Sequence, residues 1–190
     1  MYCSISDVKQ LVGVSESGDD ALITALIPAA QAAIDLYFLR TFEASANTTR
    51  YFDALRDVSG RRLNLDRDLC SINSITNGDG TTVTTGQYTV YPRNETPYYA
   101  IQLLASSGIN WQYTNDPEGA IAISGKWAYS TTAPASVSYL CTWLAAEMYR
   151  MKDNIPVAGA GVAAATSILA GDLPADIRIL LSSIPRRAVI

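Results

Sequence analysis

The sequence predicts an α+β protein, a small bundle of α-helices with an antiparallel β lobe inserted between them. Near the N-terminus and again after residue 133, apolar residues recur every three to four positions, which is the period of a helix that buries one face. Between residues 48 and 129 the period shortens to two, and Thr, Val, Ile, Tyr and Trp become frequent, as is typical of strands. A chain of 190 residues that is 48% apolar can bury a core of this kind.

Two helices are predicted before the β lobe. The first covers residues 5–12, with Ser6 or Asp7 accepting hydrogen bonds from its first amides, and it ends at Gly13. The second covers residues 19–40, and Pro28 within it predicts a kink. The apolar stripe of this second helix consists of Leu22, Ile23, Leu26, Ile27, Ala30, Ala33, Ile34, Tyr37 and Phe38.

The β lobe is predicted to contain short antiparallel strands joined by turns. Asn77-Gly78-Asp79-Gly80 predicts a tight turn, because Gly and Asn tolerate the positive φ that such turns require. The predicted strands cover residues 50–53, 62–65, 71–77, 87–91, 100–104, 110–113 and 120–124.

The helical period returns in residues 134–152, and this third helix is expected to pack on the second. Residues 157–171 are mostly Ala, Gly and Val, a composition that we expect to form a mobile arm unless another chain covers it. A short amphipathic helix follows, which Pro185 ends. We therefore expect a domain at residues 1–156, with an appended arm and C-terminal helix at residues 157–190.

Composition argues against catalysis. The chain has no histidine, the commonest general base and metal ligand at neutral pH. Asp66 with Asp68, and Asp116 with Glu118, are close enough in sequence to share an ion, but no further ligands follow at calcium-loop spacing. Residues 159–164 fit a G-x-G-x-x-A pattern, but no buried strand precedes them. We expect no enzyme activity, cofactor or metal.

Cysteine usage and charge give the expected setting. Cys3, Cys70 and Cys141 are odd in number and far apart, which fits neither a disulfide framework nor a zinc site and favours a reducing cytoplasm. No apolar run approaches the ~20 residues of a membrane helix, and the N-terminus does not read as an export signal. A net charge of −4 argues against tight binding of nucleic acid, which depends on Lys and Arg.

The order of these elements resembles the phage head-tail connector family, the neck adaptors of tailed phages. Residues 120–129 read AIAISGKWAY and are similar to the family's strand and G-x-W-G-Y turn. Ala133-Pro134 then resembles the start of its next helix. Residues 19–22 and 40–42 resemble the two ends of the family's Ala-rich helix. The resemblance covers residues 5–152; Ala128 stands where the family often has glycine, and the predicted arm has no counterpart.

The resemblance implies a non-enzymatic subunit of a homo-oligomeric ring, a dodecamer, seated beneath the portal protein in the neck of the virion. It also implies assembly in the host cytoplasm and docking of the next neck or tail protein below the ring. Genomic double-stranded DNA would pass through without being held tightly, and no membrane would be involved.

Two sets of residues are candidates for these contacts. The last helix could dock in a groove of the portal or of a neighbouring subunit, or it could fold back on its own core. Acidic residues could line the channel and repel phosphate, or they could simply be solvated loop residues. The docking candidates are Ile177, Leu180, Leu181, Ile184, Arg186 and Arg187, and the channel candidates are Asp57, Asp66, Asp68, Asp79, Asp116 and Glu118.

A second function, of a different class, is also compatible with the sequence. Aromatic residues are concentrated in the β lobe, where they could form the core or a platform for a ligand. The chain would then be a β-rich ligand- or partner-binding virion module without a ring function. The aromatic residues concerned are Tyr88, Tyr91, Tyr98, Tyr99, Trp111, Tyr113, Trp127 and Tyr129.

Overall fold

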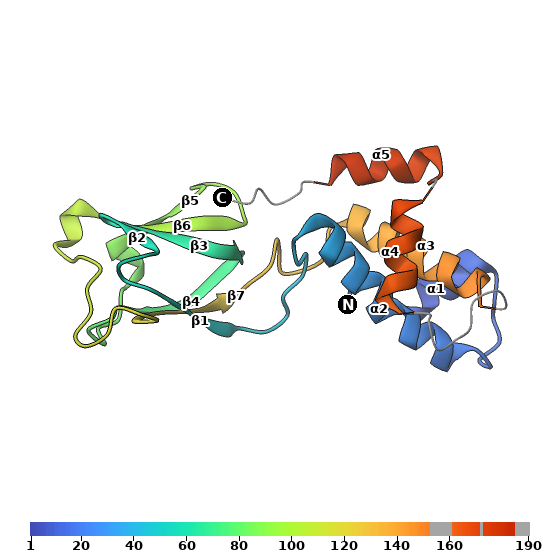
Figure 1. The fold of residues 1–190 in the computed structure, drawn as a ribbon, viewed down its shortest axis with the longest axis horizontal. Coiled ribbons are helices and arrows are strands. Elements are labelled where there is room, and N and C mark those ends of the chain that lie inside the picture. The colour runs from blue at the N-terminus through green and yellow to red at the C-terminus, as the bar shows by residue number, and fades with distance from the viewer. Residues whose placement is uncertain (153–160, 172, 185–190) are drawn as a thin grey trace. The chain divides into compact units, whose positions relative to one another are not determined.

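The computed structural model describes residues 1–152, 161–171 and 173–184. Two compact units make up the chain. The helical unit contains Met1–Arg40 and Ala133–Ile190, and the β unit contains Thr41–Thr132. The β unit is therefore inserted in the sequence between two helices (Figure 1), which confirms the predicted α+β class with an inserted antiparallel lobe.

The helices of the helical unit are α1 (Ile5–Val12), α2 (Asp20–Phe38), α3 (Ala135–Arg150), α4 (Val162–Ala170) and α5 (Ala175–Ser183).

Helix α1 is short, and both of its ends are capped. Ser4, rather than the predicted Ser6 or Asp7, is the N-cap of α1: its hydroxyl accepts from the Asp7 amide at 3.3 Å, and the Asp7 carboxylate accepts from the Ser4 amide at 2.8 Å. This reciprocal pair satisfies amides that have no partner within a helix. Gly13 ends α1 with a φ of 74°, as predicted.

Helix α2 is the central element of the helical unit. It is in contact with α1, α3 and α4, and it continues through the exposed Pro28. By length and mean hydropathy (1.5) it is the one described helix that could cross a membrane. Its apolar stripe, however, is buried within the unit, as in a core helix. The buried residues of α2 are Ile23, Leu26, Ile27, Ala30, Ala33, Ile34 and Phe38.

The prediction of an arm at residues 157–171 is wrong for its described second half. Val162–Ala170 form helix α4, in which Ala165 and Leu169 are buried and which packs on α2. Alanine has the highest helix propensity of all residues, and small side chains allow two helices to approach closely. A segment whose side chains are too small to fill a core can therefore still form a helix that packs on the outside of that core. Residues 153–160 lie outside the described residues.

The β unit is built from two antiparallel sheets. Their strands are β1 (Thr48–Phe52), β2 (Val58–Ser59), β3 (Arg62–Leu69), β4 (Ser71–Thr76), β5 (Tyr88–Tyr91), β6 (Tyr98–Leu103) and β7 (Ile121–Lys126). One sheet has the order β1-β7-β4 and the other β2-β3-β6-β5. Side chains from both sheets form one core, which includes Leu63 and Ile101 from the second sheet and Ile75, Ile121 and Ile123 from the first.

Glycine is required where β7 passes β4. A Cβ atom at Gly125 would lie 2.3 Å from the Ser71 carbonyl oxygen and 2.8 Å from Leu69 Cδ1, closer than real atoms approach. The sequence-derived turn at residues 77–80 is also present, with the Gly80 amide donating to the Asn77 carbonyl at 2.9 Å. These two positions fix how β4 begins and ends against its neighbours.

The predicted strand at residues 110–113 is wrong, whereas the other predicted strands each overlap an observed one. This segment makes one isolated β-bridge, between Tyr113 and Gly78, and is held mainly by side chains. The Asn77 amide group donates to the Asn110 carbonyl at 2.9 Å, and its oxygen accepts from the Gln112 amide at 3.2 Å. The buried Trp111 donates from Nε1 to the Arg61 carbonyl at 2.9 Å. The short strand β2 was not predicted.

Candidate interaction surfaces

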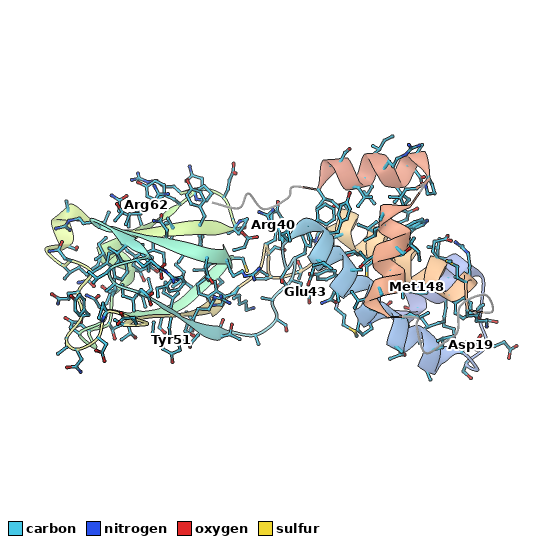
Figure 2. All side chains as sticks on the ribbon, in the orientation of Figure 1. Asp19, Arg40, Glu43, Tyr51, Arg62 and Met148 are labelled. Carbon is cyan, nitrogen blue, oxygen red and sulfur yellow. The ribbon has the colours of Figure 1, made fainter. Side chains whose placement is uncertain are left out.

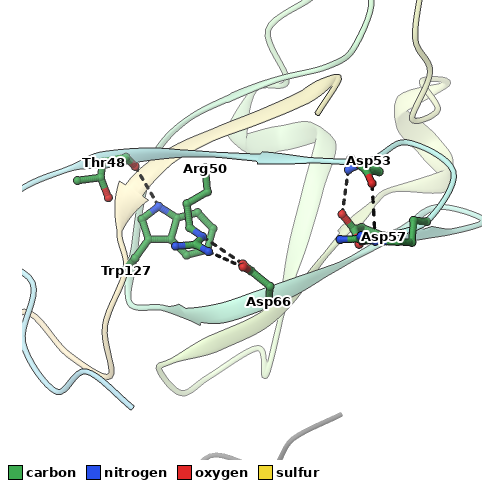
Figure 3. A network of polar contacts seen from close by, with 7 residues as sticks. Thr48, Arg50, Asp53, Asp57, Asp66 and Trp127 are labelled. Carbon is green, nitrogen blue, oxygen red and sulfur yellow. Dashed lines mark hydrogen bonds and ion pairs between the residues drawn. The ribbon is translucent and has the colours of Figure 1, made fainter. Parts of the chain in front are cut away.

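An arginine-carboxylate pair links the two sheets of the β unit (Figure 3). Arg50 comes from β1 and Asp66 from β3; Arg50 Nε lies 3.1 Å from Asp66 Oδ1, and Arg50 Nη2 bonds the other carboxylate oxygen. The guanidinium lies 5.5 Å from the centre of the Trp127 ring, whose Nε1 donates to the Thr48 carbonyl at 2.9 Å. The two donor nitrogens of the Arg50 guanidinium match the two oxygens of the carboxylate, so Arg50 compensates the negative charge of Asp66.

A second acidic group lies where β1 ends. The Asp57 carboxylate accepts from the Asp53 amide at 2.8 Å, and the Asp53 carboxylate accepts from the Gly119 amide at 2.7 Å. This bond brings the segment with the exposed Asp116 and Glu118 against the turn at residues 53–57. We call Asp53, Asp57, Asp116 and Glu118 the acidic corner.

One cation offsets part of the acidic corner. Arg56 Nε lies 3.2 Å from Asp57 Oδ1 and 3.7 Å from Asp53 Oδ2. The neighbouring Asp57 carboxylate raises the pKa of Arg56. The Arg56 side chain is 80% exposed, so water screens both ion pairs and they stabilise the fold little. The corner therefore keeps a net negative charge at the surface.

The remaining channel candidates are not collected at one place. Asp68 is buried within the β unit. Asp79 lies in the turn after β4, where it accepts from the Thr81 amide at 3.0 Å and from the Thr81 hydroxyl at 2.6 Å. These hydrogen bonds lower the pKa of Asp79, which marks it as a turn-forming residue. Of the six candidates, the structure brings together Asp57, Asp116 and Glu118, and it adds Asp53, which the sequence did not single out.

A cationic and aromatic surface lies on the four-stranded sheet. The guanidinium carbon of Arg62 is 5.2 Å from the centre of the Tyr91 ring and 5.4 Å from that of Tyr99, and Arg93 lies 5.8 Å from the Tyr91 ring. We call these four residues the arginine-tyrosine face. Figure 2 shows Arg62 on the opposite side of the β unit from Tyr51 of β1.

The aromatic residues of the β unit are divided between its core and its surface. Trp111 is buried in the core, whereas Tyr99 and Tyr113 are exposed. Tyr88, Tyr91, Tyr98, Trp127 and Tyr129 are half-buried. The sequence identified the aromatic residues but not Arg62 and Arg93, because only the pairing of β3, β5 and β6 places those cations beside the rings.

In the helical unit, the apolar face of α5 points toward its own core. Ile177, Leu181 and Ile184 are buried and Leu180 is half-buried, while Ile179 on the other side of the helix is exposed. A pocket of about 720 Å³ beside this helix is lined by Tyr37, Leu169, Leu173, Arg178, Leu181 and Ile184, among others. The structure thus has the folded-back arrangement; Arg186 and Arg187 lie outside the described residues.

An ion pair ties the ends of two helices of the helical unit together. Asp19, at the start of α2, accepts from the Tyr149 hydroxyl at 2.5 Å and from Lys152 Nζ at 2.6 Å, both at the end of α3. These bonds lower the pKa of Asp19 and raise that of Lys152. These contacts link the start of α2 to the end of α3 and so stabilise the packing of the two helices.

Among the described residues, no group of three or more Cys, Asp or Glu is placed to hold a metal.

Residues 2–82 match the family described as phage gp6-like head-tail connector protein. The matched part contains α1, α2 and β1 to β4, and it ends before the residues 120–129 that carried the most specific part of the resemblance. The match confirms the predicted resemblance to head-tail connectors. Among curated proteins, none is significantly similar to the chain.

Two solved structures share the fold. One is a chain of the neck of an empty gene transfer agent particle, determined with C6 symmetry: 14% identity, a TM-score of 0.53, and coverage of 86% of each chain. The other is a chain of the virion of a native gene transfer agent particle: 14% identity, a TM-score of 0.59, and coverage of 98% of this chain and 90% of that one. At this identity the likeness shows a common fold.

Proposed function

We propose that this chain is a non-enzymatic structural subunit in the neck of a tailed phage or related particle. Its residues 2–82 match the family of phage gp6-like head-tail connector proteins. The family match carries the proposal. The fold shared with chains from a gene transfer agent neck and virion supports it. The surfaces also support it, since the described residues offer charged and aromatic patches suited to protein contacts.

Copies of the chain form a closed ring, a dodecamer, beneath the portal protein, and the next neck or tail protein docks on the other side. A ring of identical subunits needs a contact that joins two different patches of neighbouring copies. The C6 symmetry of the gene transfer agent neck is compatible with both hexameric and dodecameric rings.

We assign the arginine-tyrosine face to the contact between neighbouring subunits. Arginine and tyrosine are enriched in protein interfaces, where they supply large contact areas and oriented hydrogen bonds. The same two arginines in the channel would bind DNA phosphates and slow the passage of the genome. A protein contact therefore fits Arg62 and Arg93 better than the channel does.

We assign the acidic corner to the channel. Asp116 and Glu118 are exposed and Asp57 lies beside them. Together they repel phosphate, over a range that becomes shorter as the salt concentration rises. Asp66, Asp68 and Asp79 are poorer channel residues, since one is paired with Arg50, one is buried and one holds a turn. The purified ring is expected to bind duplex DNA negligibly at any salt concentration.

Portal binding through the apolar face of α5 stays a prediction, and it requires that helix to leave its present site. Ile177, Leu181 and Ile184 become available to a partner groove only when they stop packing on their own unit. The exposed side of α5, which carries Ile179, needs no such rearrangement.

Electron microscopy and light scattering of the full chain, alone and with the portal protein of the same particle, test the proposal. We expect rings with a central hole. The double variant Arg62→Glu/Arg93→Glu should lose rings and remain monomeric and folded. Arg67→Glu is the control for each of the two substitutions taken singly, because it makes the same charge change as one of them at an exposed residue of β3 and should still form rings.

Two results would overturn this assignment. A chain that stays monomeric with portal protein present is not a ring-forming connector. A monomer that retains a sugar or peptide on the arginine-tyrosine face would instead be the β-rich binding module that the aromatic content also allows.

A further inference from the structure

Two cysteines that are far apart in sequence lie together inside the helical unit. Cys3 precedes α1 and Cys141 lies in α3, yet their Sγ atoms are 3.2 Å apart. Both side chains are buried. A disulfide has an S–S length of about 2.05 Å, so the two sulfur atoms need to approach by only about 1 Å. The third cysteine, Cys70, belongs to the β unit.

We propose that Cys3 and Cys141 form an intrachain disulfide when the chain meets a low-molecular-weight disulfide such as oxidised glutathione. The sequence alone suggested no pairing, because 138 positions separate the two residues. The packing of the N-terminal segment against α3 supplies the proximity that the spacing hides.

The surroundings of the pair set the order of the exchange. The hydrogen bond between the two thiols lowers the pKa of Cys3. The same contact with Cys3, together with burial, raises the pKa of Cys141. Since the thiolate is the nucleophile in thiol-disulfide exchange, Cys3 reacts first.

The reaction balances as two exchanges. The Cys3 thiolate attacks one sulfur of oxidised glutathione, which forms a mixed disulfide and releases one glutathione thiolate. The mixed disulfide removes the negative charge beside Cys141, so its thiol can pass a proton to water. Cys141 sulfur then attacks Cys3 sulfur and releases the second glutathione. Two protein thiols are oxidised, and one glutathione disulfide is reduced to two thiols.

Access to Cys3 requires the N-terminal segment to open briefly. Tyr2 holds this segment on α2: its hydroxyl donates to Asp35 Oδ1 at 2.5 Å, and its amide donates to Gln31 Oε1 at 3.4 Å. A segment held by few contacts opens locally with a smaller free-energy cost than global unfolding. The exchange is therefore slower than at an exposed thiol but does not require the protein to unfold.

The cross-link would close a loop that contains α1, α2 and the entire β unit. Closing a long loop stabilises a protein mainly by restricting its unfolded chain. The biological setting rests on the proposed function, because a particle protein passes from the reducing cytoplasm to oxidising surroundings. The chemistry itself does not depend on ring formation.

Counting free thiols in the full chain before and after treatment with oxidised glutathione tests the proposal. Of the three thiols we expect two to be lost, and peptide mapping by mass spectrometry should find residues 3 and 141 in one linked peptide. The thermal unfolding midpoint should rise and return to its original value after reduction with dithiothreitol. The Cys70→Ser variant should behave in the same way, with no free thiol remaining.

Cys70 serves as the internal control. It donates to the Lys126 carbonyl at 3.3 Å, and burial raises its pKa, so it should stay reduced. The Cys141→Ser variant should stop at a glutathione adduct on Cys3. Three free thiols after oxidation, a stable adduct on Cys3 in the native sequence, or a link that includes Cys70 would each overturn the proposal. None of these results depends on whether the chain forms rings.

Discussion

The helical unit and the β unit place their polar side chains differently. In the helical unit, Tyr2 with Asp35 and Cys3 with Cys141 face one another between packed segments. In the β unit, the guanidinium groups of Arg50, Arg56 and Arg62 lie near the surface, over aromatic rings or beside carboxylates, although Asp68 and Asn77 are buried. Buried polar pairs affect stability strongly and exposed ones weakly. We therefore expect changes at the buried pairs of the helical unit to affect stability strongly, while the exposed guanidinium groups of the β unit are free to make assembly contacts.

The largest expected effect concerns α5. Ile177 is 0% exposed and Ile179 is 70% exposed, so the two form a matched pair on one helix. Ile177→Ala should lower the free energy of unfolding by about 2–4 kcal/mol, since it removes buried methyl groups and leaves a cavity. Ile179→Ala should change it by less than about 0.5 kcal/mol. Urea unfolding followed by circular dichroism measures both.

The same pair decides between the two predicted roles of the apolar face of α5. A stability loss confined to Ile177→Ala means that this face serves the helical unit. If Ile177→Ala leaves stability unchanged but abolishes portal binding, α5 docks outward and its present site is not the functional one. Deletion of residues 171–190 extends the test, because only the outward-docking role leaves a folded monomer that no longer binds portal.

A smaller effect is expected at Asp35, which is half-buried, whereas Asp66 is exposed. Burial raises the pKa of Asp35 to about 6 from its ordinary 3.8, although the Tyr2 hydroxyl partly opposes the change. Between these two values the folded chain holds a proton that the unfolded chain has released. Stability at this site is therefore greatest below about pH 4 and falls as the pH rises through 6.

Asp35→Asn tests this pH dependence. Asparagine can still accept from Tyr2 but carries no charge, so the variant should be more stable than the native chain by about 1 kcal/mol at pH 7.5, a value reduced by partial solvent exposure. The advantage should shrink as the pH approaches 4. Thermal unfolding of both chains between pH 4 and 8 measures the difference. A constant difference across this range would mean that Asp35 does not titrate in it.

Local patterns predicted the elements of both units well. The spacing of Ile23, Ile27, Ala30 and Ile34 predicted the buried stripe of α2, and the alternation in residues 120–124 predicted β7. These patterns work because one buried face imposes a period on the sequence. Helix α4 was missed because its small residues indicated only a shortage of core-forming side chains, and the high helix propensity of Ala was given too little weight.

Relations between distant segments could not be predicted from local patterns. Cys3 meets Cys141 only because the N-terminal segment packs beside α3, and Arg62 meets Tyr91 and Tyr99 only because of the strand order β3-β6-β5. No period encodes such pairings. The acidic candidates illustrate the same limit: Asp57, Asp116 and Glu118 come together, while Asp68 is buried.

The smallest expected effect is at the Arg50-Asp66 pair, where geometry and exposure oppose each other. The donor fork and the Trp127 ring favour the pair, but the two side chains are 38% and 53% exposed, so water screens their attraction. Asp66→Asn should lower the free energy of unfolding by about 0.5 kcal/mol in low salt and by less in high salt. Arg50→Lys keeps the positive charge but loses the paired donors of the guanidinium group. If the paired hydrogen bonds stabilise the fold, this variant should lower the free energy of unfolding by a similar amount. If only the charge matters, it should leave the free energy of unfolding almost unchanged. A loss above about 2 kcal/mol in urea unfolding would show that this pair behaves as a buried one, and that the surface of the β unit contributes to stability as much as the helical interior does.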